Sequence, residues 1–234
     1  MAKAQNSAVL EQDGYDAVEL APESPEGTFA IPSDTLLDAV TVEVTLAGIL
    51  PLMFDRYPGE NTTQLQWNQK MYLAPSTNKL CLPTENIRSL LCSVNSNSAP
   101  KVLRDPRKYK KLCLALAAYT ILLGEPEDPM NIYIRRNNQP ILTGKFNESR
   151  DPVSGMYIHR STARLEKGIP NPKVRPVLPL PWSLTFRLCI LPNRDVKEAE
   201  VHNLLSDAGI PIGLGTFRPT FGKYRVAGWK RISG

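Results

Sequence analysis

Two stretches of this sequence bring together residue types that bind nucleic acids. The line "GIPIGLGTFRPTFGKYR" (209–225) combines four glycines, three aromatic side chains and three cations. Glycine lets a loop bring backbone N–H groups close to phosphates, aromatic rings stack on bases, and cations neutralise phosphate charge. The line "PKVLRDPRKYKK" (100–111) holds six cations and one acid. Cations this concentrated repel one another, so the cluster favours a polyanionic partner over the alternative of a solvated helix start.

A third stretch, residues 143–176, is long, rich in glycine and proline, and basic. A connection of this length inside a compact domain is usually functional. The residues that we expect to contact a nucleic acid are Lys101, Arg104, Arg107, Lys108, Lys110, Lys111, Arg160, Arg164, Gly213, Gly215, Phe217, Arg218, Lys223 and Arg225. Phe221 and Tyr224 either stack on bases as well or belong to the core of a last strand.

Other site chemistries find little support in the sequence. Gly213 and Gly215 lack the third glycine of a dinucleotide motif, because Arg218 stands there and the glycines follow a helix. No Gly-Lys-Ser/Thr occurs, and the four cysteines lie far apart without zinc-ligand spacing. We therefore expect no cofactor, no metal and four reduced, mostly buried thiols. Two speculative catalytic residues remain: Asp55, in the loop after the first strand, and His159, a candidate general base.

The charge is divided along the chain. Residues 1–38 hold eight acids against Lys3 alone, a net charge of −7, whereas the whole chain carries +5. The rest of the chain therefore carries +12, which suits a polyanion. Residues 1–38 also lack strong periodicity, so we expect an acidic arm that is extended or partly disordered.

The elements that must position these residues can be read from hydrophobic periodicity. Alternation places Val40, Val42, Val44 and Leu46 on one face of a first strand, and 181–191 reads as another strand. Thr84 is a possible N-cap of a short helix, and the apolar run 112–123 is either strand or helix. The pair Asn137-Asn138 marks a hairpin turn. The clearest helix is 193–209, whose inward positions are Val196, Ala199, Leu204 and Leu205.

This order gives two strand–helix–strand halves. It predicts the α+β class, with a ferredoxin-like (RRM-type) antiparallel sheet, helices on one face and a large basic insertion. Residues 39–234 would form a single nucleic-acid-binding domain with the insertion at about 143–176.

Three lines of the sequence resemble the RAMP superfamily, the ferredoxin-like proteins that build CRISPR RNA-guided complexes. "IGLGTFRPTFGKYRV" is similar to the glycine-rich loop that precedes the last strand in those proteins. "LCLPTENIRSLLCSV" is similar to a line after an early hairpin, with Pro83, Thr84 and Ile87 in step, although Glu85 and Asn86 replace the usual small residues. "LAGILPLMFDRY" resembles the opening strand and loop. Together these lines touch about a fifth of the chain.

The resemblance implies a backbone subunit whose copies line up on single-stranded guide RNA, or on DNA, beside other subunits. It also implies that 143–176 is a thumb over the guide. Asp55 stands where backbone subunits that cut target RNA hold an aspartate. The alternatives are a viral single-strand-binding or annealing protein of the same fold, a RAMP-type endoribonuclease using His159 or Asp55, and an assembly protein. We expect a cytoplasmic protein without a membrane partner, because no apolar run approaches the roughly 18–20 residues of a span.

Overall fold

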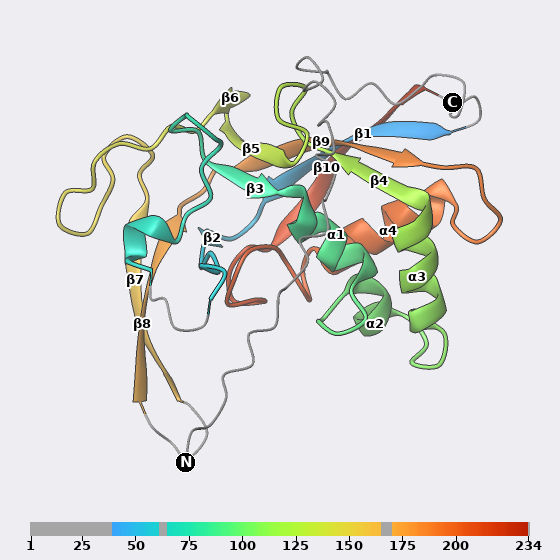
Figure 1. The fold of residues 1–234 in the computed structure, drawn as a ribbon, viewed down its shortest axis with the longest axis horizontal. Helices are drawn as coiled ribbons and strands as arrows, with labels where there is room; N and C mark the ends of the chain where they lie inside the picture. Colours follow the sequence, from blue (N-terminus) through green and yellow to red (C-terminus); the bar gives the residue numbers. More distant parts are fainter. Residues whose placement is uncertain (1–38, 61–64, 165–169, 234) are drawn as a thin grey trace, which may run out of the picture. The chain divides into compact units, whose positions relative to one another are not determined.

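The structure, a computed structural model, describes residues 39–60, 65–164 and 170–233 (Figure 1). The acidic arm expected at 1–38 lies outside the described residues, and so do the side chains of 163–171. None of the described helices is long and apolar enough to cross a lipid bilayer. All four cysteines are buried thiols, as their spacing predicted.

The larger sheet has seven antiparallel strands in the order β10-β1-β9-β5-β3, with β4 paired to β9 and β6 to β5. Strands β4 and β5 follow each other along the same side of β9, because Thr120 pairs with Ile190 and Ile134 with Leu184. The strands are β1 (Val40–Gly48), β3 (Cys81–Pro83), β4 (Thr120–Leu123), β5 (Asn131–Arg136), β6 (Gln139–Pro140), β9 (Ser183–Ile190) and β10 (Tyr224–Ser233).

One face of this sheet carries the core. Val42, Val44 and Leu46 are fully buried while Glu43 between them is exposed, as the alternation in β1 predicted. Val40, the first residue of β1, is only half-buried. The helices that bury this face are α1 (Thr84–Cys92), α2 (Ala99–Leu103), α3 (Tyr109–Tyr119) and α4 (Glu198–Ala208). The fold is thus of the α+β class, with an antiparallel sheet and helices, as predicted.

Two details of the helices differ from the sequence prediction. Pro83 stands at the N-cap of α1, and the Thr84 hydroxyl donates to the Met130 carbonyl (3.2 Å) instead of capping the helix. In α4, Ala199 is exposed and Val201 is buried in its place, because the helix begins only at Glu198 and its first turn faces outward. The run 112–123, for which the sequence left helix and strand open, is helix in its first part and strand in its second, since α3 ends at Tyr119 and β4 follows it directly.

The hairpin predicted at Asn137-Asn138 is confirmed, and both residues have positive φ angles, 52° and 63°. The segment 143–176 holds one long strand and most of a second, both of which the sequence analysis missed. They are β7 (Tyr157–Arg164) and β8 (Pro170–Leu178), an antiparallel pair that we call the ribbon. Together with β2 (Leu52–Met53) they form a second sheet in the order β2-β8-β7. The ribbon extends away from the larger sheet (Figure 1).

Candidate nucleic-acid interface

The glycine-rich loop, which we define as residues 209–223, joins α4 to β10 and is fixed to the segment 51–53. Thr216 N–H donates to the Met53 carbonyl (3.0 Å) and Gly222 N–H to the Pro51 carbonyl (2.8 Å). At Gly215, where φ is +73°, a Cβ atom would lie 2.6 Å from the Met53 carbonyl oxygen. Glycine is therefore required here so that two backbone segments can approach each other.

The N–H groups of this loop are divided between internal bonds and the surface. Gly213 N–H donates to the Ala208 carbonyl (3.1 Å) and Leu214 N–H to the Gly222 carbonyl (2.9 Å). The N–H groups of Gly215 and Phe217 make no hydrogen bond with another group in the described part of the chain. Of the two glycines expected to bind phosphate, Gly215 is thus the one whose N–H has no acceptor among the described residues.

Three aromatic rings form a row from the loop to the ribbon. The Phe217 ring is half-exposed, and its centroid lies 6.1 Å from the Phe221 centroid. The Phe221 ring in turn meets His159 of β7 edge-on at 5.3 Å. We call His159, Phe221 and Phe217 the ring row. The structure therefore brings His159, a residue of the segment 143–176, against the glycine-rich loop, a contact that nothing in the sequence spacing required.

Phe217 has a positive φ of +56°. A non-glycine residue in this region costs about 1–3 kcal/mol and persists only where its surroundings hold it. Side chains in such conformations cluster at ligand sites, so the position of this half-exposed ring is a functional signal.

A hollow of about 410 Å³ lies beside Phe217, between the loop and α2. Its walls include Val102 of α2 and Ile212, and Arg218 also lines it. Arg218 is half-buried and donates to the Gly213 carbonyl at the 3.5 Å limit of hydrogen bonding. Burial lowers the pKa of Arg218, and the nearby Tyr224 opposes that shift. The loop thus places one cation at the hollow, beside an aromatic ring.

The other loop residues occupy different positions. Tyr224 is fully buried and donates its hydroxyl hydrogen to the Leu205 carbonyl (2.9 Å), so it belongs to the core. Lys223 is half-buried, and its carbonyl accepts the N–H groups of Ile49 and Leu50. Arg225 is exposed on β10.

The cations of 100–111, the basic cluster, are of two kinds. Arg104 Nε donates to Glu200 at 3.0 Å and its guanidinium lies 3.7 Å from Asp207, so this side chain joins α2 to α4. Lys101 donates to the Asn95 carbonyl, and Lys111 lies 3.7 Å from Asp195 while 85% of its side chain is exposed. The cations that are exposed and make no ion pair with a described residue are Arg107, Lys108 and Lys110.

On the ribbon, His159 and Arg160 are successive residues of β7, so their side chains lie on opposite faces. His159 faces the glycine-rich loop, and Arg160 is exposed on the other face. Arg164 ends β7, and its side chain lies outside the described residues.

Asp55 is held between two cations. Arg175 of β8 donates to its carboxylate at 2.6 Å, and Lys70 Nζ lies 3.4 Å from it and also donates to the Val174 carbonyl. We call Asp55, Lys70 and Arg175 the ion triad. A cavity of about 140 Å³ reaches from Asp55 to Thr216 of the loop. Asp55 is the one acidic or histidine side chain among the described residues lining it.

The described residues hold no group of three or more His, Cys, Asp or Glu side chains placed to bind a metal ion. The sequence analysis missed both cationic partners of Asp55. Arg175 lies within the basic segment it singled out, whereas nothing in the sequence marks Lys70.

No family model matches this chain, and no curated protein matches it in sequence. Among solved structures it is similar to a chain of the "Cryo-EM structure of the Type III-B Cmr-beta bound to cognate target RNA". The TM-score is 0.52 at 10% sequence identity, and the match covers 83% of this chain and 61% of the other. The two chains therefore share a fold, which in the solved structure belongs to a component of the Cmr-beta complex.

Proposed function

We propose that this chain is a subunit that binds single-stranded nucleic acid, RNA in the first place, along the glycine-rich loop and the ribbon. The observation that carries the proposal is the ring row, which joins the two segments through His159, Phe221 and Phe217 and leaves Phe217 half-exposed. Aromatic rings beside cations are the combination that binds unpaired bases and their phosphates together.

In this proposal the exposed ring of Phe217 stacks on a base. Arg218 and the open Gly215 N–H bind the adjoining phosphate, and Lys223 and Arg225 add charge along β10. The exposed cations of the basic cluster and Arg160 of the ribbon continue the phosphate contacts on either side. Arg104 contributes by holding α2 against α4 and so supports the wall of the hollow.

The setting that we propose is a CRISPR-type RNA-guided complex in which copies of this chain line up along a guide RNA with other subunits. The order β10-β1-β9-β4, with helices before β4 and before β10, supports the ferredoxin-like core that the RAMP superfamily uses. The likeness to a chain of a type III-B Cmr complex bound to target RNA supports the same setting.

Binding of a fluorescent single-stranded RNA, followed by anisotropy, tests the interface. Phe217→Ala should weaken binding about 5- to 150-fold, the range for losing one stacked base. The double substitution Lys108→Gln/Lys110→Gln should reduce the slope of log K against log salt by about 1.4, since each single-strand phosphate contact contributes about 0.7. A charge-matched control, Lys197→Gln/Lys230→Gln, should leave that slope unchanged. Equal affinity and equal slope in all variants would contradict the proposed interface.

The nucleic acid that copurifies from cells separates the proposed setting from a general single-strand-binding or annealing protein. A discrete short RNA, together with a mass that rises by whole subunits, supports a guide complex. Fragments of random length support the general binder.

The ribonuclease alternative is tested with labelled RNA and the substitutions Asp55→Ala and His159→Ala. The ion pairs of Asp55 and the ring contact of His159 favour structural and stacking roles for these side chains. We therefore expect no metal-independent cleavage by the wild type. Cleavage that either substitution abolishes would replace the binding proposal with an enzymatic one.

A further inference from the structure

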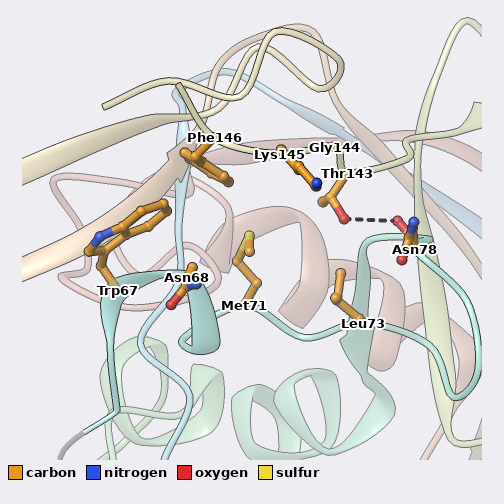
Figure 2. A pocket seen from close by; sticks show the side chains of 9 residues that line it. All are labelled: Trp67, Asn68, Met71, Leu73, Asn78, Thr143, Gly144, Lys145 and Phe146. Atoms are coloured by element: carbon orange, nitrogen blue, oxygen red, sulfur yellow. Dashed lines mark hydrogen bonds between the residues drawn. The ribbon is translucent and has the colours of Figure 1, made fainter. Parts of the chain in front are cut away.

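A second cavity, of about 630 Å³, lies on elements that the proposed interface does not use (Figure 2). One wall is the short helix η2 (Trp67–Gln69) with the residues that follow it, and the other is the segment 143–146 before the ribbon. Its volume lies within the range of about 300–1,000 Å³ that small-molecule sites occupy.

The walls are held together by backbone bonds. The Thr143 N–H and hydroxyl both donate to the Asn78 carbonyl, at 2.9 and 3.3 Å, and the Leu80 N–H donates to the Ile141 carbonyl. Behind the second wall, the buried carboxylate of Asp151 accepts the Gly144 N–H at 3.1 Å. The cavity is therefore a built feature of the chain.

The two ends of the cavity differ in chemistry. Trp67 and Phe146 lie at one end with ring centroids 4.4 Å apart, and Thr143 and Asn78 lie at the other (Figure 2). Lys145 lies between the ends, across the cavity from the buried Met71. Both aromatic rings are half-exposed, so they offer surface to a flat ligand.

Three polar side chains of the cavity, those of Asn68, Asn78 and Lys145, are left without a protein partner among the described residues. The side-chain amides of Asn68 and Asn78 make no hydrogen bond with the described part of the chain, and Lys145 makes no ion pair there. Lys145 is the one charged side chain among the described lining residues, and no carboxylate accompanies it. The site therefore suits an anion that also carries a flat ring with donors and acceptors on its edge.

We infer that this cavity is a nucleotide site. The base lies against Trp67 and Phe146, an asparagine amide reads its edge, and Lys145 binds the phosphate. An amide can meet a base edge with one donor and one acceptor at once, as asparagine does with adenine. The same nucleotide chemistry is offered by a free mononucleotide and by one nucleotide of a bound strand, and the test below separates these sources. The inference does not depend on the proposed function of the glycine-rich loop.

The test uses the tryptophan fluorescence of the full chain, titrated with AMP and with adenosine. We expect AMP to quench the wild-type signal, and Trp67→Phe to abolish the quenching while Trp229→Phe retains it. Lys145→Gln should weaken AMP binding about tenfold, because it removes the cation that binds the phosphate. It should leave adenosine binding unchanged, because adenosine has no phosphate. Phe146→Leu should weaken both ligands about fivefold, the cost of a lost stacking face.

Three results would overturn the inference: no quenching by AMP at millimolar concentration, quenching that persists in Trp67→Phe, or equal AMP affinity in Lys145→Gln. Circular dichroism and thermal melting test whether each variant is folded, and Lys145→Gln should fold normally because Lys145 is exposed and Gln is a shorter, neutral, polar side chain.

A single-stranded oligonucleotide identifies the source of the nucleotide. If Lys145→Gln weakens the oligonucleotide as well as AMP, the site holds a nucleotide of the strand, and if it weakens AMP alone, the site holds a free nucleotide. Both outcomes support the site. Phe217→Ala should leave AMP quenching unchanged, so failure of the interface at the loop and failure of this cavity are distinguishable.

Discussion

The ion triad gives the sharpest prediction for the stability of this chain. Asp55 accepts a hydrogen bond from Arg175 at 2.6 Å and lies 3.4 Å from Lys70, and the three side chains are only 26%, 13% and 16% exposed. Asp55→Asn keeps the volume of the side chain and removes its charge, which leaves two largely buried cations without a counter-ion. Removing one partner of a fully buried pair costs about 3–5 kcal/mol, and an exposed pair contributes about 0–1 kcal/mol. For this partly exposed triad we expect a loss of about 2–3 kcal/mol in the free energy of unfolding.

Urea denaturation followed by circular dichroism measures this loss. With an m-value of about 2 kcal/mol/M, the midpoint of Asp55→Asn should fall by about 1 M. Glu85→Gln is a matched control, because Glu85 and Arg88 form an ion pair at 3.7 Å with 71% and 49% of their side chains exposed. We expect that control to shift the midpoint by about 0.2 M or less.

A double-mutant cycle tests the cause. Arg175→Gln combined with Asp55→Asn should cost about 1–2 kcal/mol less than the sum of the single changes, because the second substitution removes a cation that the first left unpaired. A midpoint shift as small as that of Glu85→Gln, or strictly additive costs, would refute the reasoning. In that case Asp55 would not be a structural anchor of the ribbon, and its place beside the loop would call for another explanation.

Three further predictions concern the loop, the segment before the ribbon and the thiols. Gly222→Ala should destabilise the chain by more than about 3 kcal/mol in urea denaturation, because φ is +72° and a Cβ would lie 1.9 Å from the Leu214 carbonyl oxygen. Gly59→Ala, with φ of +99° and no atom within 4 Å, should cost only about 1 kcal/mol. Burial alone would raise the pKa of Asp151, but hydrogen bonds from Ser154 and three backbone N–H groups outweigh it and lower the pKa. The stability gained is present above the unfolded pKa of about 3.9 and is lost as the pH falls through the lower folded value. Asp151→Asn should therefore cost about 2 kcal/mol at pH 7, and the gap to the wild type should narrow below about pH 4; a gap that is constant from pH 7 to 3 would contradict this. Burial raises the pKa of Cys81 to about 12 and of Cys92 to about 11, so a thiol reagent at pH 8 should modify neither in the native protein and all four cysteines after denaturation.

The sequence predicted those parts of the fold whose signal is local. Alternation identified β1, an apolar strand pattern identified β9, and the Asn137-Asn138 pair identified the hairpin, because each depends on side chains within a few residues of one another. The inward face of α4 was misassigned at its start because Ala199 fits the apolar period, whereas the helix begins at Glu198 and its first turn places Ala199 on the exposed side and Val201 in the core.

The ribbon was missed because prolines interrupt β8 at 170, 172 and 176, and proline argues against a strand in the middle of a sheet. Along most of its length β8 pairs, among the described residues, with β7 on one edge and with no strand on the other. A proline, which has no N–H to donate, is tolerated where its nitrogen faces that unpaired edge. This edge position depends on which strands pair over long range, so it cannot be predicted from the neighbouring residues in the sequence.

The candidate site shows the same division. Residue types in the glycine-rich loop and the basic cluster indicated a polyanion. The contact of His159 with Phe221, the pairing of Arg104 with α4 and the ion pair of Asp55 with Arg175 all join residues more than 50 positions apart. The ion pair of Asp55 with Lys70 spans 15 positions, which is still beyond the reach of a local sequence pattern. Composition selects candidates, and only the fold decides which of them face a ligand and which hold the chain together.

The ribbon's attachment has a consequence for how it can change. Its backbone pairs with the rest of the described chain near one end of its two strands, where Leu52 and Met53 meet Leu178 and Val177 and where Tyr157 bridges to Arg150. Inserting two residues into each strand would lengthen the ribbon by about 7 Å and leave His159 facing Phe221. Inserting one residue into each strand would move the side chains beyond the insertion to the opposite face of the ribbon. The length of the ribbon can therefore change in steps of two residues per strand, without changes to the sheet that supports it.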